Sequence, residues 1–153
     1  MNNTYDKITR FCLFRERCTY EVLQKLRKLE VDENDWQEVI RQLKEEKYLD
    51  DVRYIKAYIN AKIYIKKWGK KKIQAELSMR RLDKEVVKQN FLDVDDDVYI
   101  GNLNHLAERK WPSLSKKSDR EKTASLYRYL ASKGYESDLI MDWVKMQAKK
   151  QVE

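Results

Sequence analysis

Apolar positions along the chain follow one gap pattern that recurs three times. The first set of five positions is Val22, Leu26, Val31, Trp36 and Ile40. A shift of 51 residues lands on five further apolar residues, and a second shift of 53 residues lands on five more. The shifted sets are Ile73, Leu77, Leu82, Val87 and Phe91, then Leu126, Leu130, Tyr135, Ile140 and Val144. Repeats of this length are typical of stacked supersecondary units.

The spacing within each set predicts two helices that are separated by a short turn. In the first unit, we expect Thr19 to cap the helix TYEVLQKLRKL. Asn34 and Gln37 are expected to open the next helix as a capping box, in which each side chain accepts from the backbone of the other.

The later units carry comparable signals for helix starts and stops. Asp83 is expected to cap the helix DKEVVKQNF of the second unit. In the third unit, Ser118 and Glu121 form a capping box, and Gly134 is the expected residue just after the helix end.

A further helix is expected to precede each pair, and the clearest runs from Asp50 or Asp51 to Lys66. Its apolar residues follow helical spacing. The part INAKIYI is rich in β-branched residues, so a strand is the local alternative. Its continuity with DDVRYIKAY favours the helix.

The patterns predict an all-α chain of three tandem three-helix modules in an elongated array. The predicted modules are 5–47, 50–92 and 95–150. Modules of this size bury little core alone, so neighbours are expected to support each other. The third module contains an insertion at 112–119, PSLSKKSD, which we expect to be an exposed loop.

Composition agrees with helices and excludes several classes of protein. The 153 residues include only three glycines and one proline, which is too few for many short strands. The chain contains no apolar run of membrane-spanning length, and its first residues lack the apolar core of a secretory signal. Cys12 and Cys18 are poorly spaced for pairing on one helix, so we expect reduced thiols in a cytoplasmic protein, with a disulfide as the alternative.

Positive charge is concentrated in the middle of a chain whose net charge is +7. Residues 1–50 carry 10 basic and 11 acidic side chains, whereas residues 53–90 carry 12 basic and 3 acidic ones. Such a cluster is typical of contact with nucleic acid or an acidic protein surface, and a solvated lysine-rich face is the alternative. The candidate binding residues are Lys62, Lys66, Lys67, Lys70, Lys71, Lys72, Arg80 and Arg81.

The densest part of this cluster is KIYIKKWGKKKI, residues 62–73. Trp68 is expected to plug the core of its module, and Gly69 to let the chain turn into the next helix. Three lysines then occupy the first helical turn, where the helix macrodipole disfavours cations. Fold stability does not explain them, which favours a binding role. The expected structural core includes Trp36, Trp68, Leu26, Leu77 and Leu130.

No catalytic constellation is readable in the sequence. DVDDDVYIGNLN, residues 93–104, lacks the glycine and the final glutamate of a calcium loop. The glycines are too few and too scattered for a phosphate-binding loop, and His105 is the sole histidine. We therefore expect no enzyme activity, no metal site and no cofactor.

Four stretches make the chain resemble the RecX family of regulators of the RecA recombinase. They are RERCTYEVLQKL (15–26), YLDDVRYIKAYI (48–59), KWGKKKIQAEL (67–77) and RYLASKGYESDLI (128–140). The resemblance covers about residues 10–150, in the order of the family. Lys47 and Arg81 stand where the family often has glycine, and Cys18 stands where serine is common. These differences bear on turn geometry.

The resemblance implies helix-turn-helix-like repeats and a non-enzymatic role in DNA recombination and repair. Such proteins bind the RecA–DNA filament along its groove and restrain its extension, ATPase and strand exchange. A cytoplasmic monomer is expected, with single- or double-stranded DNA as a weaker partner or one reached through the filament. The alternative is a direct DNA binder in which the last helix of a module enters a groove. Acidic residues at the starts of those helices in the first and third modules disfavour this alternative, whereas the last helix of the middle module, DKEVVKQNF, is less acidic and keeps it open.

Overall fold

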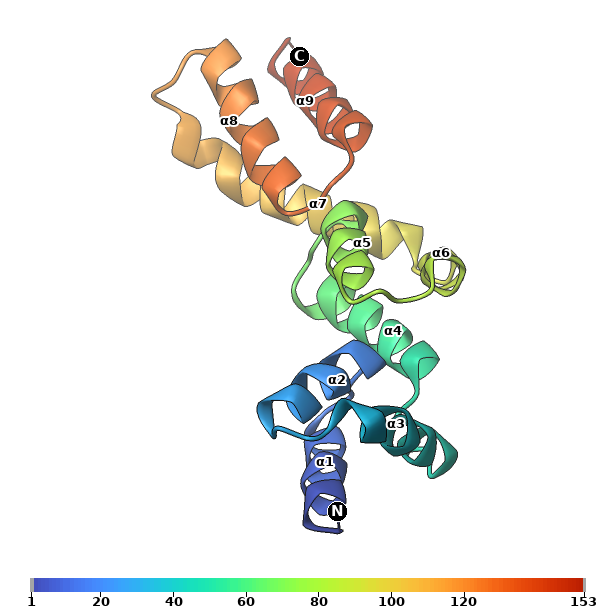
Figure 1. The fold of residues 1–153 in the computed structure, drawn as a ribbon. Coiled ribbons are helices and arrows are strands. Elements are labelled where there is room, and N and C mark those ends of the chain that lie inside the picture. The colour runs from blue at the N-terminus through green and yellow to red at the C-terminus, as the bar shows by residue number, and fades with distance from the viewer. Residues whose placement is uncertain (1, 153) are drawn as a thin grey trace. The chain divides into compact units, whose positions relative to one another are not determined.

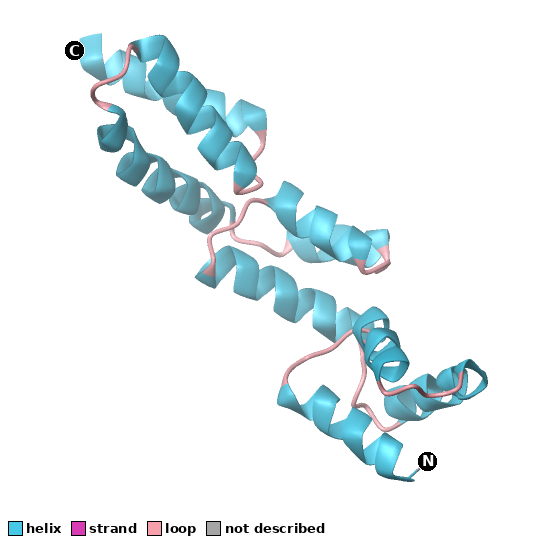
Figure 2. Cartoon of the chain, turned by 60° about the vertical axis from the view of Figure 1, so that its left-hand side comes forward, coloured by secondary structure: helices cyan, strands magenta, loops and turns pink. Residues whose placement is uncertain are grey.

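The computed structural model describes residues 2–152, and these residues form helices joined by turns, without a strand (Figure 1). Figure 2 shows the same described chain as helices and loops only. The α-helices are α1 (Asn2–Phe14), α2 (Thr19–Lys28), α3 (Trp36–Glu45), α4 (Asp51–Asn60), α5 (Lys70–Met79), α6 (Lys84–Leu92), α7 (Asp96–Lys110), α8 (Asp119–Ser132) and α9 (Ser137–Val152). The short helical turns are η1 (Glu33–Asp35), η2 (Ala61–Ile65) and η3 (Trp111–Leu114). The predicted all-α class is confirmed.

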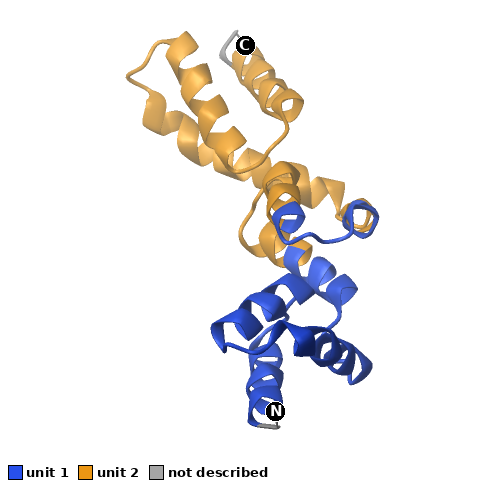
Figure 3. Ribbon diagram, viewed as in Figure 1, with its two compact units in different colours: residues 1–58, 77–88 blue, residues 59–76, 89–153 orange. Residues whose placement is uncertain are grey.

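The chain divides into two compact units (Figure 3). Unit 1 holds the chain up to Tyr58 together with Leu77–Lys88, and unit 2 holds Ile59–Glu76 together with the chain from Gln89 onward. The division runs through the predicted second module, because α5 and α6 each have one part in either unit. The module boundaries at 5–47, 50–92 and 95–150 therefore stay a prediction.

Unit 1 is built around an apolar cluster to which α1, α2 and α3 all contribute. Its buried members are Ile8, Cys12, Val22, Leu26, Val39, Ile40, Leu43 and Leu49. Complete burial of a side chain of this kind stabilises the fold by about 1.5–3 kcal/mol. Trp36 packs against the cluster while remaining half-buried, and its indole N–H donates to the carbonyl of Val31 at 2.9 Å. Trp36 thus lies at the edge of the core, because its polar nitrogen requires a partner.

The fifteen repeated apolar positions mark the inward face of the helices. Eleven of them are buried, including the predicted core residues Leu26, Leu77 and Leu130, which are at most 1% exposed. The other four are half-buried: Val31, Trp36, Phe91 and Val144. The recurring gap pattern therefore indicates which side of each helix faces the core.

The second helix of each repeat ends in the same way. Glu30, Arg81 and Gly134, which are related by the same shifts of 51 and 53 residues, all have left-handed backbone with φ of 58°, 57° and 100°. The next N–H then bonds back to a carbonyl five residues earlier, as in a Schellman motif. These bonds are Val31 N to Leu26 O (3.1 Å), Leu82 N to Leu77 O (3.3 Å) and Tyr135 N to Leu130 O (3.1 Å). The predicted role of Gly134 is confirmed.

Lys47 and Arg81, which stand at positions typical of glycine, keep the backbone that glycine favours. Lys47 has a φ of 66° and follows the end of α3. A side chain in this conformation costs roughly 1–2 kcal/mol relative to glycine in the folded state. The turn geometry is thus maintained without the glycine.

Two predicted helix caps are confirmed in the structure. The carboxylate of Asp83 accepts from the N–H groups of Glu85 and Val86, at 2.8 and 3.3 Å, before α6. The hydroxyl of Ser118 accepts from the N–H of Glu121 at 3.3 Å at the start of α8.

The two caps predicted in the first unit are wrong. Cys18 is the residue that precedes α2, and the carboxylate of Glu21 accepts from its N–H at 3.2 Å. Thr19 is already helical, and its N–H and hydroxyl donate to Asp51 at 2.7 and 2.8 Å. The expected pair of Asn34 and Gln37 is replaced by Asp32, whose carboxylate accepts from the N–H of Asn34 and opens η1 instead.

Two segments depart from regular α-helix, one at the end of α4 and one in the insertion. α4 continues into the π-helical turn η2, so INAKIYI is helical and the strand alternative is wrong. The insertion at 112–119 is only partly an exposed loop, because Leu114 is 5% exposed and ends the 3-10 turn η3. Burial of this one apolar side chain packs the start of the insertion against the rest of unit 2.

The left-handed position at Arg81 predicts that glycine is better there. We expect Arg81→Gly to raise the free energy of unfolding by about 0.5–1 kcal/mol, since the relieved backbone strain exceeds the added entropy of the unfolded chain. Lys88→Gly, at an exposed interior position of α6, is the control and should lower stability by roughly 0.7 kcal/mol. Urea unfolding measures both, and a loss of stability in both variants would contradict the assignment.

Candidate functional site

The lysine-rich stretch surrounds the turn between η2 and α5, where the sequence places Trp68 and Gly69. The turn begins with Lys67, which has a left-handed φ of 57°. The N–H of Trp68 then donates to the carbonyl of Lys62 at 2.9 Å and closes the helix end. The hydroxyl of Tyr135 donates to the carbonyl of Lys67 at 2.7 Å, so the turn between α8 and α9 holds the same segment.

Gly69 is required by close approach rather than by an unusual backbone angle. A β-carbon at Gly69 would lie 2.1 Å from the carbonyl carbon of Gly134, and one at Gly134 would lie 2.5 Å from the β-carbon of Lys72. The N–H of Gly69 donates to Lys133 O at 2.7 Å, and the N–H of Lys71 donates to Gly134 O at 3.0 Å. Gly69 lies in the turn before α5 as expected, and its lack of a side chain also allows two backbones to touch.

A polar group from the third repeat completes this junction within unit 2. The Tyr99 hydroxyl accepts from the N–H of Lys70 at 2.9 Å and donates to the carboxylate of Glu136. Burial, followed by the bond to Glu136, raises the pKa of Tyr99 well above its usual range, so the hydroxyl keeps its proton. The amide of Asn102, which is 8% exposed, donates to the carbonyl of Ile63 in η2 at 2.8 Å.

The first N–H groups of α5 are thus bound inside the protein. Those of Gly69, Lys70 and Lys71 all have partners in the turn between α8 and α9 or on α7. The start of a helix is a common place for anions because its N–H groups are free. Here these N–H groups already donate within the protein, so the attraction of an anion depends on the lysine ammonium groups.

Aromatic rings position three of the candidate lysines. The ammonium groups of Lys62 and Lys72 lie 4.5 and 4.1 Å from the ring centroid of Trp68, and that of Lys70 lies 4.6 Å from the ring of Tyr99. Contacts of this kind contribute roughly 0.5–1 kcal/mol each at exposed sites. Trp68 is half-buried and serves as their platform, so the expectation that its indole plugs the core is corrected.

The remaining candidate residues divide between the two units. Lys66 and Lys71 are exposed and Lys67 is half-buried, all in unit 2 beside the Trp68 platform along the chain. Arg80 and Arg81 belong to unit 1, where the guanidinium of Arg80 lies 5.2 Å from the ring of Tyr58. We call the six lysines between 62 and 72 the lysine turn.

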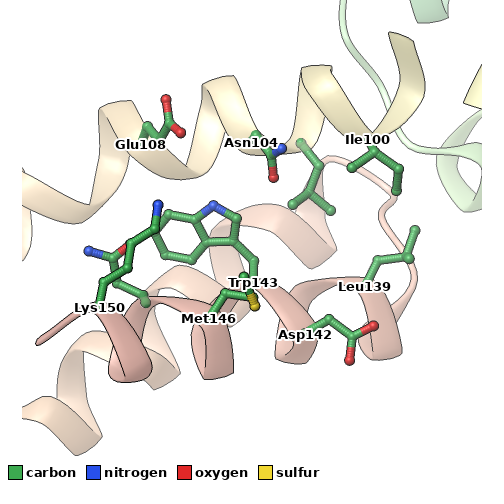
Figure 4. Close-up of a pocket in the computed structure, with 10 residues that line it drawn as sticks. Ile100, Asn104, Glu108, Leu139, Asp142, Trp143, Met146 and Lys150 are labelled. Carbon is green, nitrogen blue, oxygen red and sulfur yellow. The ribbon is translucent and has the colours of Figure 1, made fainter. Parts of the chain in front are cut away.

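Unit 2 also contains a groove between α7 and α9, which sequence reasoning did not find (Figure 4). Its volume is about 330 Å³, and Trp143 points from α9 toward α7. The apolar lining includes Leu103, Leu139 and Met146, whose side chain is 56% exposed. The apolar spacing of α9 alone could not have predicted the groove, because the sequence does not show that α7 forms its other side.

A second basic surface, on unit 1, was also missed. A pocket of about 450 Å³ between the end of α1 and one face of α2 is lined by Phe11, Arg15, Arg17, Tyr20, Glu21, Gln24, Lys25 and Lys28. It was missed because the charges of residues 1–50 nearly cancel. Counting charges over shorter segments would have found it, because residues 1–29 carry 7 basic and 3 acidic side chains, whereas residues 30–50 carry 3 basic and 8 acidic ones.

The described part of the chain lacks the features of two other kinds of site. Between residues 2 and 152, His, Cys, Asp and Glu side chains do not gather in threes as a metal site would need. Over the same span, no helix is both long enough and apolar enough to cross a bilayer.

The backbone contact at Gly69 predicts opposite effects of alanine at two glycines. Gly69→Ala should lower the free energy of unfolding by at least about 2 kcal/mol, since a methyl group would overlap the Gly134 backbone. Gly101→Ala, where a β-carbon meets nothing within 4 Å on helix α7, should raise it by about 1 kcal/mol. Urea unfolding of the two variants tests this, and a stable Gly69→Ala protein would refute the close approach.

Comparison with known proteins gives matches over most of the chain. Residues 50–89 match the family model described as RecX, second three-helix domain, and residues 97–144 match RecX, third three-helix domain. A crystal structure of RecX from Lactobacillus salivarius superposes with a TM-score of 0.81 at 24% identity, covering 95% of this chain and 94% of that one. This last likeness concerns the fold.

Curated relatives named "Regulatory protein RecX" are similar in sequence. The protein from Vibrio parahaemolyticus is 32% identical over 127 residues, which cover 82% of this chain and 79% of the relative. The one from Oceanobacillus iheyensis is 28% identical over 140 residues, which cover 92% of this chain and 52% of the relative. The one from Clostridium botulinum strain Eklund 17B is 34% identical, with 82% and 59% covered. The chain thus spans between half and three fifths of the length of the latter two.

Two consecutive domain models cover more than half of the chain, and the Vibrio relative exceeds 30% identity over most of its own length. The chain belongs to the RecX family.

Proposed function

We propose that this chain is a non-enzymatic regulator of the RecA recombinase, acting as a monomer in the bacterial cytoplasm. In this proposal it binds the RecA–DNA filament and restrains filament extension, ATP hydrolysis and strand exchange during recombination and DNA repair. Membership of the RecX family carries the proposal, since the curated relatives are named regulatory proteins.

The lysine turn supports a contact with the polyanionic filament. Three of its lysines, Lys70, Lys71 and Lys72, lie in the first turn of α5, where the helix dipole disfavours cations. The first N–H groups of that helix are bound within unit 2, so the lysines have no evident part in stabilising the helix start. Trp68 and Tyr99 hold three of them in place, which lowers the entropy lost when phosphate or carboxylate groups bind. A merely solvated face, the alternative, has no need of such positioning.

The states of the two thiols support a role without covalent catalysis. Burial raises the pKa of Cys12 and of Cys18 to about 11, so both remain protonated near neutral pH. The thiolate is the nucleophilic form, and reactive cysteines instead have lowered pKa values and partial exposure. Both thiols are free and buried, which suits packing.

Direct reading of a DNA groove by a third helix is the alternative function. The starts of these helices carry carboxylates, with Glu38 in α3, Glu85 in α6 and Asp138 in α9. Before α6, the carboxylate of Asp83 also occupies two N–H groups. Negative charge at the helix end that meets phosphates weighs against this alternative.

The lysine turn is expected to contribute to filament binding. Replacing Lys66, Lys67 and Lys71 by glutamine should weaken co-sedimentation with the RecA filament and reduce the slope of log affinity against log salt by up to about 0.7–0.9 per lysine. The matched control replaces Lys116, Lys145 and Lys149, which are exposed elsewhere on unit 2. Circular dichroism checks that both triple variants keep their helices. Equal affinity and equal salt slope in the two variants would assign the turn to the solvated face.

The proposed regulator and the direct DNA binder differ in the amount of protein that they require. Added to preassembled RecA filaments on single-stranded DNA, the chain should lower ATP hydrolysis at well below one copy per RecA subunit. A filament binder acts at ends or along the groove, so one copy affects many subunits. A competitor for DNA must instead cover the lattice, and acts poorly once filaments have formed.

The measurement is steady-state ATPase at fixed salt, titrated with this chain. A protein of similar charge that lacks the repeats, such as lysozyme, controls for non-specific cation effects. Inhibition that appears only when free DNA is saturated would replace the proposed function by direct DNA binding.

A further inference from the structure

The basic pocket of unit 1 combines cations with aromatic rings on an otherwise acidic background. Four cationic side chains and one carboxylate line it: Arg15, Arg17, Lys25, Lys28 and Glu21. The acidic residues of the first 50 are concentrated from Glu30 onward, in and around η1 and α3. The pocket is therefore a local positive region within a near-neutral segment.

The cations in the pocket are ordered by the rings beside them. The guanidinium of Arg17 lies 3.7 Å from the ring centroid of Phe11 and 5.9 Å from that of Phe14, and its Nε donates to Phe11 O at 2.9 Å. The ammonium of Lys25 lies 5.5 Å from the Phe11 ring. Arg15 pairs with Glu21 at 2.8 Å, which fixes its guanidinium at the rim. The pocket is thus preorganised.

Two features indicate that the pocket favours an anion with an aromatic part. Burial and the neighbouring Arg15 lower the pKa of Arg17, so an anion beside its guanidinium would be favourable. Next to it, Phe14 is 83% exposed, although the burial of a phenylalanine side chain is normally worth about 1.5–3 kcal/mol. An exposed ring beside these cations suits stacking of a flat apolar face.

We propose that this pocket binds a single strand of nucleic acid, with phosphates at Arg15, Arg17, Lys25 and Lys28 and a base stacked on Phe14. Cationic grooves with aromatic platforms are the common means of binding single strands without sequence preference. A duplex fits less well, because its bases are already stacked on each other and offer no free face to Phe14. An acidic peptide supplies charge but no flat ring for Phe14 at each residue.

The proposal does not rest on regulation of the recombinase. It concerns unit 1 and bare oligonucleotide, whereas the proposed function concerns preassembled filaments and was argued from the lysine turn in unit 2. Failure of one leaves the other intact.

The first experiment measures anisotropy of a labelled oligothymidylate of about 12 nucleotides with the full chain. The background carries the triple glutamine change of the lysine turn, so that unit 2 contributes little. Phe14→Ala should weaken binding about tenfold, whereas Leu13→Ala, at the adjacent 66% exposed position, should have no effect. An abasic oligonucleotide of the same length should not distinguish Phe14→Ala from its parent, because it has no base to stack.

The second experiment tests the charges. Lys25→Gln with Lys28→Gln should reduce the slope of log affinity against log salt by about 1.4, as expected for two lost phosphate contacts on a single strand. Lys44→Gln, at an exposed position on α3, is the control. Photocrosslinking with 4-thiothymidine should label peptides within residues 11–28.

Three outcomes would overturn the proposal. They are equal affinities of Phe14→Ala and Leu13→Ala, equal weakening of abasic and oligothymidylate binding by Phe14→Ala, and crosslinks confined to residues outside 11–28. Competition by polyglutamate as effective as that by oligothymidylate would likewise reject it, in favour of an acidic peptide as the occupant.

Discussion

The contact of Gly69 with the Gly134 backbone is the constraint on which unit 2 depends. A turn from the second repeat and a turn from the third meet with too little space for a β-carbon on either side. That approach brings the N–H groups that begin α5 within reach of Lys133 O and Gly134 O. Because these groups are bound within the protein, the helix start is stable without a carboxylate cap. The lysines of α5 can therefore occupy positions where a capping acid is otherwise common.

The turns at the helix ends also differ in whether they need glycine. One Schellman turn recurs three times, yet only Gly134 both ends a helix and receives a neighbouring backbone. Glu30 and Arg81 adopt the same left-handed conformation without glycine. The strain that they add, roughly 1–2 kcal/mol each, is tolerated where the following apolar residue, half-buried Val31 or buried Leu82, packs and fixes the turn. Glycine is thus needed for space at Gly134, whereas at the other two positions it would only relieve strain.

Much of the fold could be predicted from the sequence because each helix shows its buried face through apolar spacing. The repeat pattern, the cap at Asp83 and the stop at Gly134 all follow from local chemistry. The wrong cap at Thr19 reflects tertiary competition, since Asp51 binds the donors of Thr19 from a distance of 32 residues in sequence. The wrong cap at Asn34 reflects local competition from Asp32, two residues earlier. The sequence predicts Trp68 in the core because indole side chains are usually largely buried. The contacts of the Lys62 and Lys72 ammonium groups with its ring become visible only in the three-dimensional structure. The pocket of unit 1 was concealed by averaging charge over too long a window.

The two basic surfaces show that charge summed over a long segment is a poor guide to where cationic side chains gather on a helical protein. The lysine turn is dense in sequence and would be found by any count. The unit 1 pocket gathers its cations from the end of α1 and from one face of α2, where side chains four residues apart, such as Lys25 and Glu21, lie together. In both, an aromatic ring holds a cation that the local backbone field or a neighbouring cation disfavours. Because such an arrangement adds little to folding, it supports the proposals that both surfaces bind anions.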